Sequence, residues 1–233
     1  NFADMMGQMG GNMAKTKQQG IVFSQGQIFQ TQVPTNMAID GNGFFAVTDG
    51  THTEYTRDGR FEFKNGGLQN PAGQTVVGYK LNEDGSMSGQ SGPMKLDMDP
   101  NSKLWGGKYN ALRFDENGIL YGQINQTDPT TGQQAGKEVP IYQVQMASFA
   151  NASGLKRVGT TNFQETESSG KAVTGVAGQG NMGSIQTGAL EMSNVDFAQQ
   201  AALVQMTKQN FDANMAAYKA MDKLAESAIG LVR

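Results

Sequence analysis

The sequence contains no cysteine and a single histidine, His52. Without cysteine, disulfides, thiolate catalysis and Cys-ligated metals are excluded. A single histidine excludes a His-based zinc site, and a Ser–His nucleophile pair could use only His52. His52 stands in a Thr-rich stretch, which is more typical of a solvated turn side chain than of a catalytic base. We therefore expect a protein that is not an enzyme and has no catalytic, cofactor-binding or metal-binding residues.

Apolar residues are scarce as well. They make up 37% of the 233 residues, whereas about 45–50% (with Gly counted) is usual. No apolar run approaches the roughly 20 residues of a membrane-spanning helix. A net charge of −3 with no Lys/Arg cluster argues against nucleic-acid binding. The composition predicts modest cores, no membrane insertion, and segments that become buried only against partners.

Two segments match the start of a ligand-binding motif, one for a dinucleotide and one for calcium, but neither match is complete. Residues 41–46 match G-x-G-x-x-A, but the following Phe44–Val47 is typical of a strand, not of the helix that this motif requires. Residues 97–101 resemble the start of a calcium loop. Ser102 stands at the glycine position and Lys108 at the position of the bidentate glutamate. We therefore predict no cofactor, no metal and no small-molecule substrate.

What the sequence has in abundance is glycine, with 31 residues. In residues 1–20, Gly7, Gly10 and Gly11 interrupt a near-helical spacing of methionines. We interpret this segment as an irregular N-terminal arm that either becomes ordered by a partner or is simply a loose terminus. No charged-then-apolar secretion signal is visible, and the chain starts at Asn1, which leaves room for a lost upstream segment.

Short alternating segments separated by turn dipeptides predict a β-rich fold from residue 21 onward. Strands are expected around 37–39, 44–47, 53–57, 75–77, 111–114, 119–124 and 139–147, with hairpin turns at Asp49-Gly50 and Asp58-Gly59. Residues 150–188 have little periodicity and predict extended surface structure. We assign 21–80 and 136–188 to a β-rich core domain and 81–135 to a small inserted outer β region.

The pattern becomes helical after Ser193 or Asn194, either of which can cap a helix. Residues 195–232 contain no proline and only Gly230, enough for a helix of about 55 Å. Its apolar residues form two stripes, and a helix docked on its own domain would need only one. We assign 189–233 to a C-terminal helical, coiled-coil-like region for packing between subunits. The predicted interface residues are Phe197, Leu203, Val204, Phe211, Met215, Tyr218, Met221, Leu224 and Ile229.

Several motifs together resemble the flagellar hook and basal-body rod protein family. They are residues 38–45, 55–61, 67–79 and 147–170 of the β region, and 188–196, Gly-Ala-Leu-Glu-Met-Ser-Asn-Val-Asp, before the helix. The residues that carry the resemblance as structural motif positions are Gly41, Gly43, Phe44, Phe45, Tyr55, Arg57, Gly59, Leu190 and Asn194. The family's N-terminal helix is missing, and residues 199–202, Gln-Gln-Ala-Ala, depart from its usual helix pattern.

The resemblance implies a structural subunit that polymerises into a hollow helical tube around an export channel and transmits motor torque for motility. It implies self-association, other flagellar axial proteins as partners, a periplasmic or extracellular location, and export without a cleaved signal peptide. Residues 77–79, 114–118 and 189–191 favour hook protein, and we prefer it narrowly. The short 80–140 region also suits a distal rod protein. A secreted β-rich carbohydrate- or surface-binding module is the alternative from another class, and it would predict a clustered aromatic face.

Overall fold

The computed structural model describes residues 23–96, 104–105, 107–127, 134–194 and 197–230, with backbone alone at 126–127, 134–135, 197–200 and 225–230. The chain divides between Met192 and Ser193 into two compact units. We call the first the β unit and the second the helical unit. The mostly β fold with a long C-terminal helix that the sequence predicts is confirmed.

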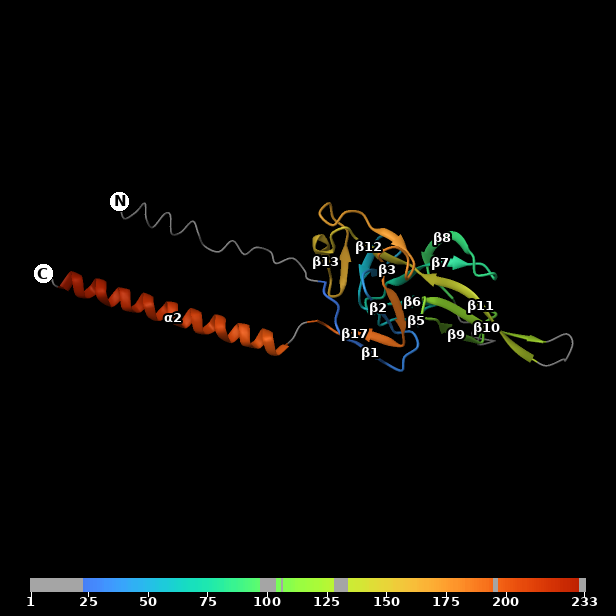
Figure 1. Ribbon diagram of the computed structural model, residues 1–233, viewed down its shortest axis with the longest axis horizontal. Helices are drawn as coiled ribbons and strands as arrows, with labels where there is room; N and C mark the ends of the chain where they lie inside the picture. Colours follow the sequence, from blue (N-terminus) through green and yellow to red (C-terminus); the bar gives the residue numbers. More distant parts are fainter. Residues whose placement is uncertain (1–22, 97–103, 106, 128–133, 195–196, 231–233) are drawn as a thin grey trace. The chain divides into compact units, whose positions relative to one another are not determined.

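The first half of the β unit is a series of short strands joined by tight turns (Figure 1). They are β1 (Ile28–Gln30), β2 (Met37–Asp40), β3 (Phe44–Thr48), β4 (Thr53–Thr56), β5 (Glu62–Lys64), β6 (Gly67–Gln69), β7 (Thr75–Leu81) and β8 (Met87–Pro93).

The second half begins with two longer strands and returns to short ones. Its elements are β9 (Ala111–Phe114), β10 (Ile119–Thr127), β11 (Gln134–Val144), β12 (Met146–Ser148), the 3₁₀ turn η1 (Ala152–Gly154), β13 (Lys156–Val158), β14 (Asn162–Gln164), β15 (Val173–Gly175), β16 (Ser184–Thr187) and β17 (Ala189–Glu191). The helical unit contains α2 (Phe197–Gly230).

The main sheet has the strand order β13-β14-β4-β3-β7-β11-β10-β9, with β12 and β15 attached through β3. Two small antiparallel pairs stand outside it, β1 with β17 and β2 with β16. The first strands of the β unit thus pair with its last strands. This pairing brings Ile28–Gln30 beside Ala189–Glu191.

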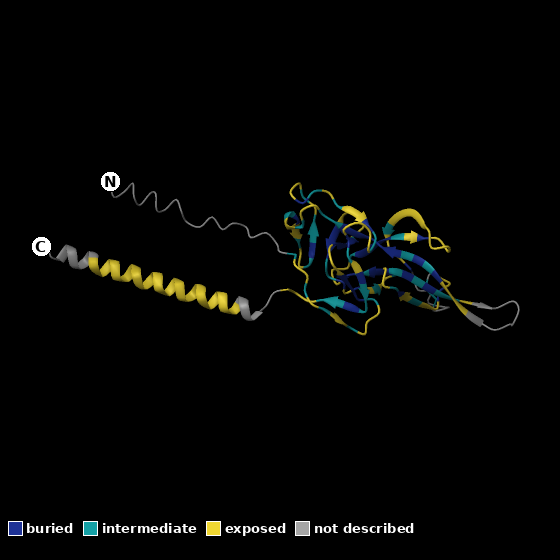
Figure 2. Cartoon of the chain, viewed as in Figure 1, coloured by how far each residue is buried: buried dark blue, intermediate teal, exposed yellow. Residues whose placement is uncertain are grey.

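Strand β3 lies at the centre of the unit because both of its faces are buried. Its side chains alternate between two hydrophobic clusters, with Phe45 and Val47 in the larger and Phe44 and Ala46 in the smaller. Successive strand residues point to opposite faces. A continuous apolar run is therefore what a strand between two cores requires, and Figure 2 shows the dark interior that results.

Most predicted strands are confirmed, from 37–39 in β2 to 139–147 in β11 and β12. The hairpin predicted at Asp58-Gly59 is wrong, because β4 pairs with β3 and β14 while β5 pairs with β6. Gly59 has a different role. A Cβ atom there would lie 1.5 Å from the carbonyl oxygen of Met37. The glycine therefore permits a close backbone approach and does not form a turn.

Residues 150–188 contain more structure than their irregular composition indicates. Three of their short strands are attached to other parts of the fold, β14 to β4, β15 to β12 and β16 to β2. Each contributes only two to four paired residues. Segments this short leave no periodicity that a sequence pattern could reveal.

Helix α2 spans 34 residues, about 51 Å at 1.5 Å per residue. All of its described side chains are exposed (Figure 2). The predicted cap at Ser193 or Asn194 adjoins residues 195–196, which lie outside the described residues. Within the described part of the chain, no helix is long and apolar enough to cross a membrane.

We expect Gly59→Ala to lower the free energy of unfolding of the β unit by about 2–3 kcal/mol, because the methyl group must displace the Met37 backbone. The matched control is Gly92→Ala on the edge strand β8, where a Cβ atom meets nothing within 4 Å. Its effect should stay within about 0.5 kcal/mol. Chemical denaturation measures both, and equal effects would contradict the close-approach explanation.

Candidate functional site: the junction where the chain enters and leaves the β unit

The first and last strands of the β unit, β1 and β17, lie side by side. Strands β1 and β17 are antiparallel, with Ile28 opposite Glu191 and Gln30 opposite Ala189. Beyond the strands, the Met192 N–H donates to the Gln27 carbonyl at 2.9 Å. The incoming and outgoing segments are therefore held side by side. We call this region, residues 23–30, 40–43, Arg57 and 189–192, the junction.

Arg57 and Glu191 form the central contact of the junction. Arg57 Nε donates to Glu191 Oε2 at 3.0 Å, and Nη2 donates to Oε1 at 3.1 Å. The two side chains are only 20% and 10% exposed. A two-bond pair of this kind fixes orientation as well as distance. Because 134 residues separate the partners, the pair connects β17 to the end of β4.

The remaining donor of Arg57 binds the glycine loop between β2 and β3. Nη1 donates to the carbonyls of Gly41 and Gly43, both at 2.8 Å. These glycines have φ angles of 108° and 125°, a region that other residues rarely adopt. A Cβ on Gly43 would also lie 2.8 Å from Met146 Cε. Glycine is thus required to turn both carbonyls toward the guanidinium.

The incoming segment is attached to the same loop and to the same carboxylate. The Gly26 N–H donates to Glu191 Oε1 at 2.9 Å. Gln25 accepts from the Gly41 N–H at 3.0 Å and donates to Asp40 Oδ1 at 3.1 Å. The Phe23 ring packs edge-on against Phe44, with centroids 5.1 Å apart. These contacts hold residues 23–26 to the core before β1 begins.

The structure brings together many, but not all, of the predicted motif residues. Gly41, Gly43, Arg57 and Leu190 lie at the junction, and the Phe44 ring lies 6.0 Å from the Arg57 guanidinium carbon. The other predicted motif residues lie elsewhere, Phe45 and Tyr55 in the two cores, Gly59 under Met37, and Asn194 in the helical unit.

Sequence reasoning missed the roles of Glu191, Gln25 and Asp40. Glu191 does lie beside Leu190 in the segment that carries the resemblance, and it is a charged residue in a three-residue strand. That position was the one available signal. Its partner could not be identified, because the contact depends on the sheet topology and not on spacing along the chain.

The second candidate surface lies on α2, where the sequence predicts packing between subunits. The predicted interface side chains that the structure describes are all exposed, from 43% at Met215 to 70% at Tyr218 and Leu224. Leu203, Val204, Phe211 and Met221 fall between these values. Phe197 and Ile229 belong to the helix, but their side chains lie outside the described residues. Large apolar side chains with this exposure bury their surface only against another molecule or segment.

His52 lies in the turn between β3 and β4. Its ring Nδ1 is 3.9 Å from Asp49 Oδ2, and both side chains are largely exposed. Hydrogen bonds from the His52 and Thr51 backbone N–H groups lower the pKa of Asp49. This arrangement caps a turn. Among the described residues, no three His, Asp or Glu side chains gather as a metal site would need.

Comparison with known proteins identifies relatives of the chain. Residues 38–120 match the family described as flagellar hook protein FlgE/F/G D1 domain. The flagellar basal-body rod protein FlgG of Borreliella burgdorferi is 29% identical over 216 residues, which are 91% of this chain and 70% of that protein. FlgG of Bacillus subtilis is 28% identical over 85% of this chain and 65% of the relative.

A hook relative matches a shorter part of the chain. The flagellar hook protein FlgE of Escherichia coli is 31% identical over 131 residues, 54% of this chain and 33% of that protein. The matched family segment contains the glycine loop and Arg57, two parts of the junction. The family match and these relatives together support assignment of the chain to the flagellar hook and basal-body rod protein family. The relatives are named as flagellar basal-body rod and hook proteins, and these names support a structural subunit of the flagellar axial structure.

We expect Arg57→Gln to lower the free energy of unfolding of the β unit by about 2–4 kcal/mol, because it leaves Glu191 without its charged partner. Arg113→Gln is the matched control. Arg113 forms an ion pair with Glu138 in which the two side chains are 55% and 47% exposed, so its loss should cost at most about 1 kcal/mol. Equal effects in chemical denaturation would contradict a special role for the junction pair.

Proposed function

We propose that this chain polymerises, through its terminal helix, into a hollow helical tube that transmits motor torque along the flagellar axis. The observation that supports this is the exposure of two apolar stripes on α2. Val204, Phe211, Met215 and Tyr218 form one, and the second comprises Leu203, Met206, Met221 and Leu224. At 3.6 residues per turn, the stripes are centred about 120° apart around the helix.

Two stripes at this angle need two different neighbours. Burying one large apolar side chain is worth about 1.5–3 kcal/mol, so eight exposed ones are a strong drive for association. The third face of the helix is polar and includes Gln205, Gln209, Asp212 and Lys219. Contacts on two faces with the same kind of helix make a head-to-tail interface, and such interfaces continue into filaments when the rotation does not close.

The junction gives this polymer its connection to the β unit. Force on α2 reaches the β unit through residues 192–196 and then β17, which is held by the β1 ladder and by Arg57. The glycine loop passes that force to β2 and β3, the centre of the fold. We infer that the junction keeps β17 attached to the β unit when force acts on the chain beyond Met192.

Within the axial structure we favour a rod position. The rod relatives align over 91% and 85% of the chain. The hook relatives of E. coli and Helicobacter pylori align over 54% and 52%, although at slightly higher identity. The β unit also contains no separate outer domain among its described residues. Hook, which the sequence motifs favoured narrowly, is the second candidate because residues 38–120 match a family model shared by hook and rod proteins.

The proposal carries with it the partners and location that the family implies. The chain would contact copies of itself and other flagellar axial proteins, and reach the flagellum by export without a cleaved signal peptide. It would act without enzymatic chemistry. A carbohydrate-binding module would need an exposed aromatic cluster, whereas the described part of the β unit exposes one large aromatic side chain, Phe29.

The double variant Phe211→Asp with Tyr218→Asp should abolish tube formation by the full chain, because it places two carboxylates in one stripe. Electron microscopy measures the assembly, and the thermal unfolding of the β unit should be unchanged. Gln205→Asp with Gln209→Asp adds the same charge on the polar face and should still form tubes. Tubes from the stripe variant would contradict the proposal.

The position along the axis can be tested by complementation. We expect the full chain to restore motility to a bacterium that lacks its distal rod protein, but not to one that lacks its hook protein. Restoration of the hook mutant alone would reverse the assignment. Swimming in soft agar measures the outcome, and the Phe211/Tyr218 variant is the negative control in both strains.

A further inference from the structure

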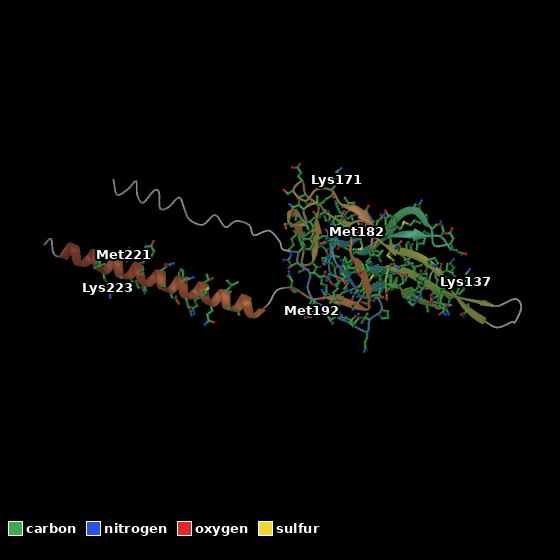
Figure 3. All side chains as sticks on the ribbon, viewed as in Figure 1. Lys137, Lys171, Met182, Met192, Met221 and Lys223 are labelled. Carbon is green, nitrogen blue, oxygen red and sulfur yellow. The ribbon has the colours of Figure 1, made fainter. Side chains whose placement is uncertain are left out.

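Two sets of methionines among the described residues differ sharply in exposure. Met37, Met94, Met146 and Met182 of the β unit are at most 8% exposed. Met206, Met215 and Met221 of α2 are 63%, 43% and 68% exposed. Figure 3 labels a member of each group, Met182 among the side chains of the β unit and Met221 on the helix. An oxidant in solution therefore has access to the second group and not to the first.

The exposed helical methionines lie on the two surfaces that we propose as interfaces. Met206 and Met221 belong to one stripe and Met215 to the other. A thioether is apolar and flexible, which suits contacts that must adapt as subunits pack. Its sulfoxide is polar and chiral, and it disrupts apolar interfaces. One oxygen atom on any of these sulfurs therefore changes a stripe from apolar to polar.

The reaction needs only a peroxide. The methionine sulfur attacks one peroxide oxygen, the O–O bond breaks, an S–O bond forms, and water leaves. Sulfur is oxidised and the peroxide is reduced, so that each sulfoxide consumes one peroxide. The chain has no cysteine that would compete for the oxidant, and thioether oxidation is reversible by sulfoxide reductases.

We propose that Met206, Met215 and Met221 form a peroxide-sensitive modification site, whose oxidation prevents a free subunit from joining the polymer. The inference rests on the proposed function, because the stripes must be the packing surfaces. Within the polymer the same sulfur atoms would be covered by neighbouring helices. Oxidation would then act on unassembled subunits and spare assembled ones.

Two other exposed methionines, which lie outside the helical stripes, serve as a comparison for this site. Met87 on β8 and Met192 at the junction are 46% and 54% exposed, and both are reachable by peroxide, but neither lies on a helical stripe. Figure 3 labels Met192 at the end of the β unit. The Met192 contact that holds the junction is made by its backbone N–H, which oxidation of the sulfur leaves in place.

The test treats the unassembled full chain with hydrogen peroxide, maps added oxygen by peptide mass spectrometry, and measures assembly by light scattering and electron microscopy. We expect oxygen on Met206, Met215 and Met221 before the buried four, and a rise of roughly tenfold or more in the concentration needed to assemble. Polymer formed before treatment should acquire oxygen at these three residues at least about tenfold more slowly.

Two variants separate the site from other methionines. Met206→Leu, Met215→Leu and Met221→Leu together keep the stripes apolar at similar volume, so this variant should assemble equally with and without peroxide. Met87→Leu with Met192→Leu should remain as sensitive as the unchanged chain. Met5, Met6, Met9, Met13 and Met98 are present in both variants, so their oxidation cannot explain a difference.

Each outcome bears on one of the two proposals. Normal assembly of a chain oxidised at all three residues would overturn the modification site, as would peroxide sensitivity of the triple leucine variant. Equal oxidation of free and assembled chain would overturn the protection. Failure of the untreated chain to assemble would instead refute the proposed function, on which the modification site depends.

Discussion

The ion pair between Arg57 and Glu191 is the contact on which the organisation of this protein depends. It joins residues 134 positions apart and uses the remaining guanidinium donor for two glycine carbonyls. The pair thereby connects the last strand of the β unit, the loop before its central strand, and the incoming chain at Gly26. These contacts hold the β unit together where the chain enters and leaves its strands.

The chain divides its apolar residues between two different tasks. In the β unit they fill two clusters on either side of β3, and few large ones remain exposed. In α2 they remain on the surface in two stripes. The first arrangement stabilises one molecule, and the second is the surface that we propose for association between subunits.

How much the sequence reveals differs from element to element. Strand β3 was predictable because a run of four apolar residues followed by the turn dipeptide Asp49-Gly50 is typical of a buried strand. Gly59 was assigned to a turn because Asp-Gly dipeptides usually form turns, but the approach of Met37 decides its role. The short strands of residues 150–188 form because they pair with strands elsewhere in the chain, and such long-range pairing leaves no local sequence pattern.

The sequence by itself determined the class of fold and the two apolar stripes of the C-terminal helix, because each depends on local periodicity. Contiguous motifs carried the resemblance to the flagellar hook and rod family. Only the tertiary structure decided that Arg57 meets Glu191, that Gly41 and Gly43 present their carbonyls to it, and that β1 pairs with β17. Those contacts join residues far apart in the chain. Their partners follow from the order of strands in the sheets, which no single local pattern encodes.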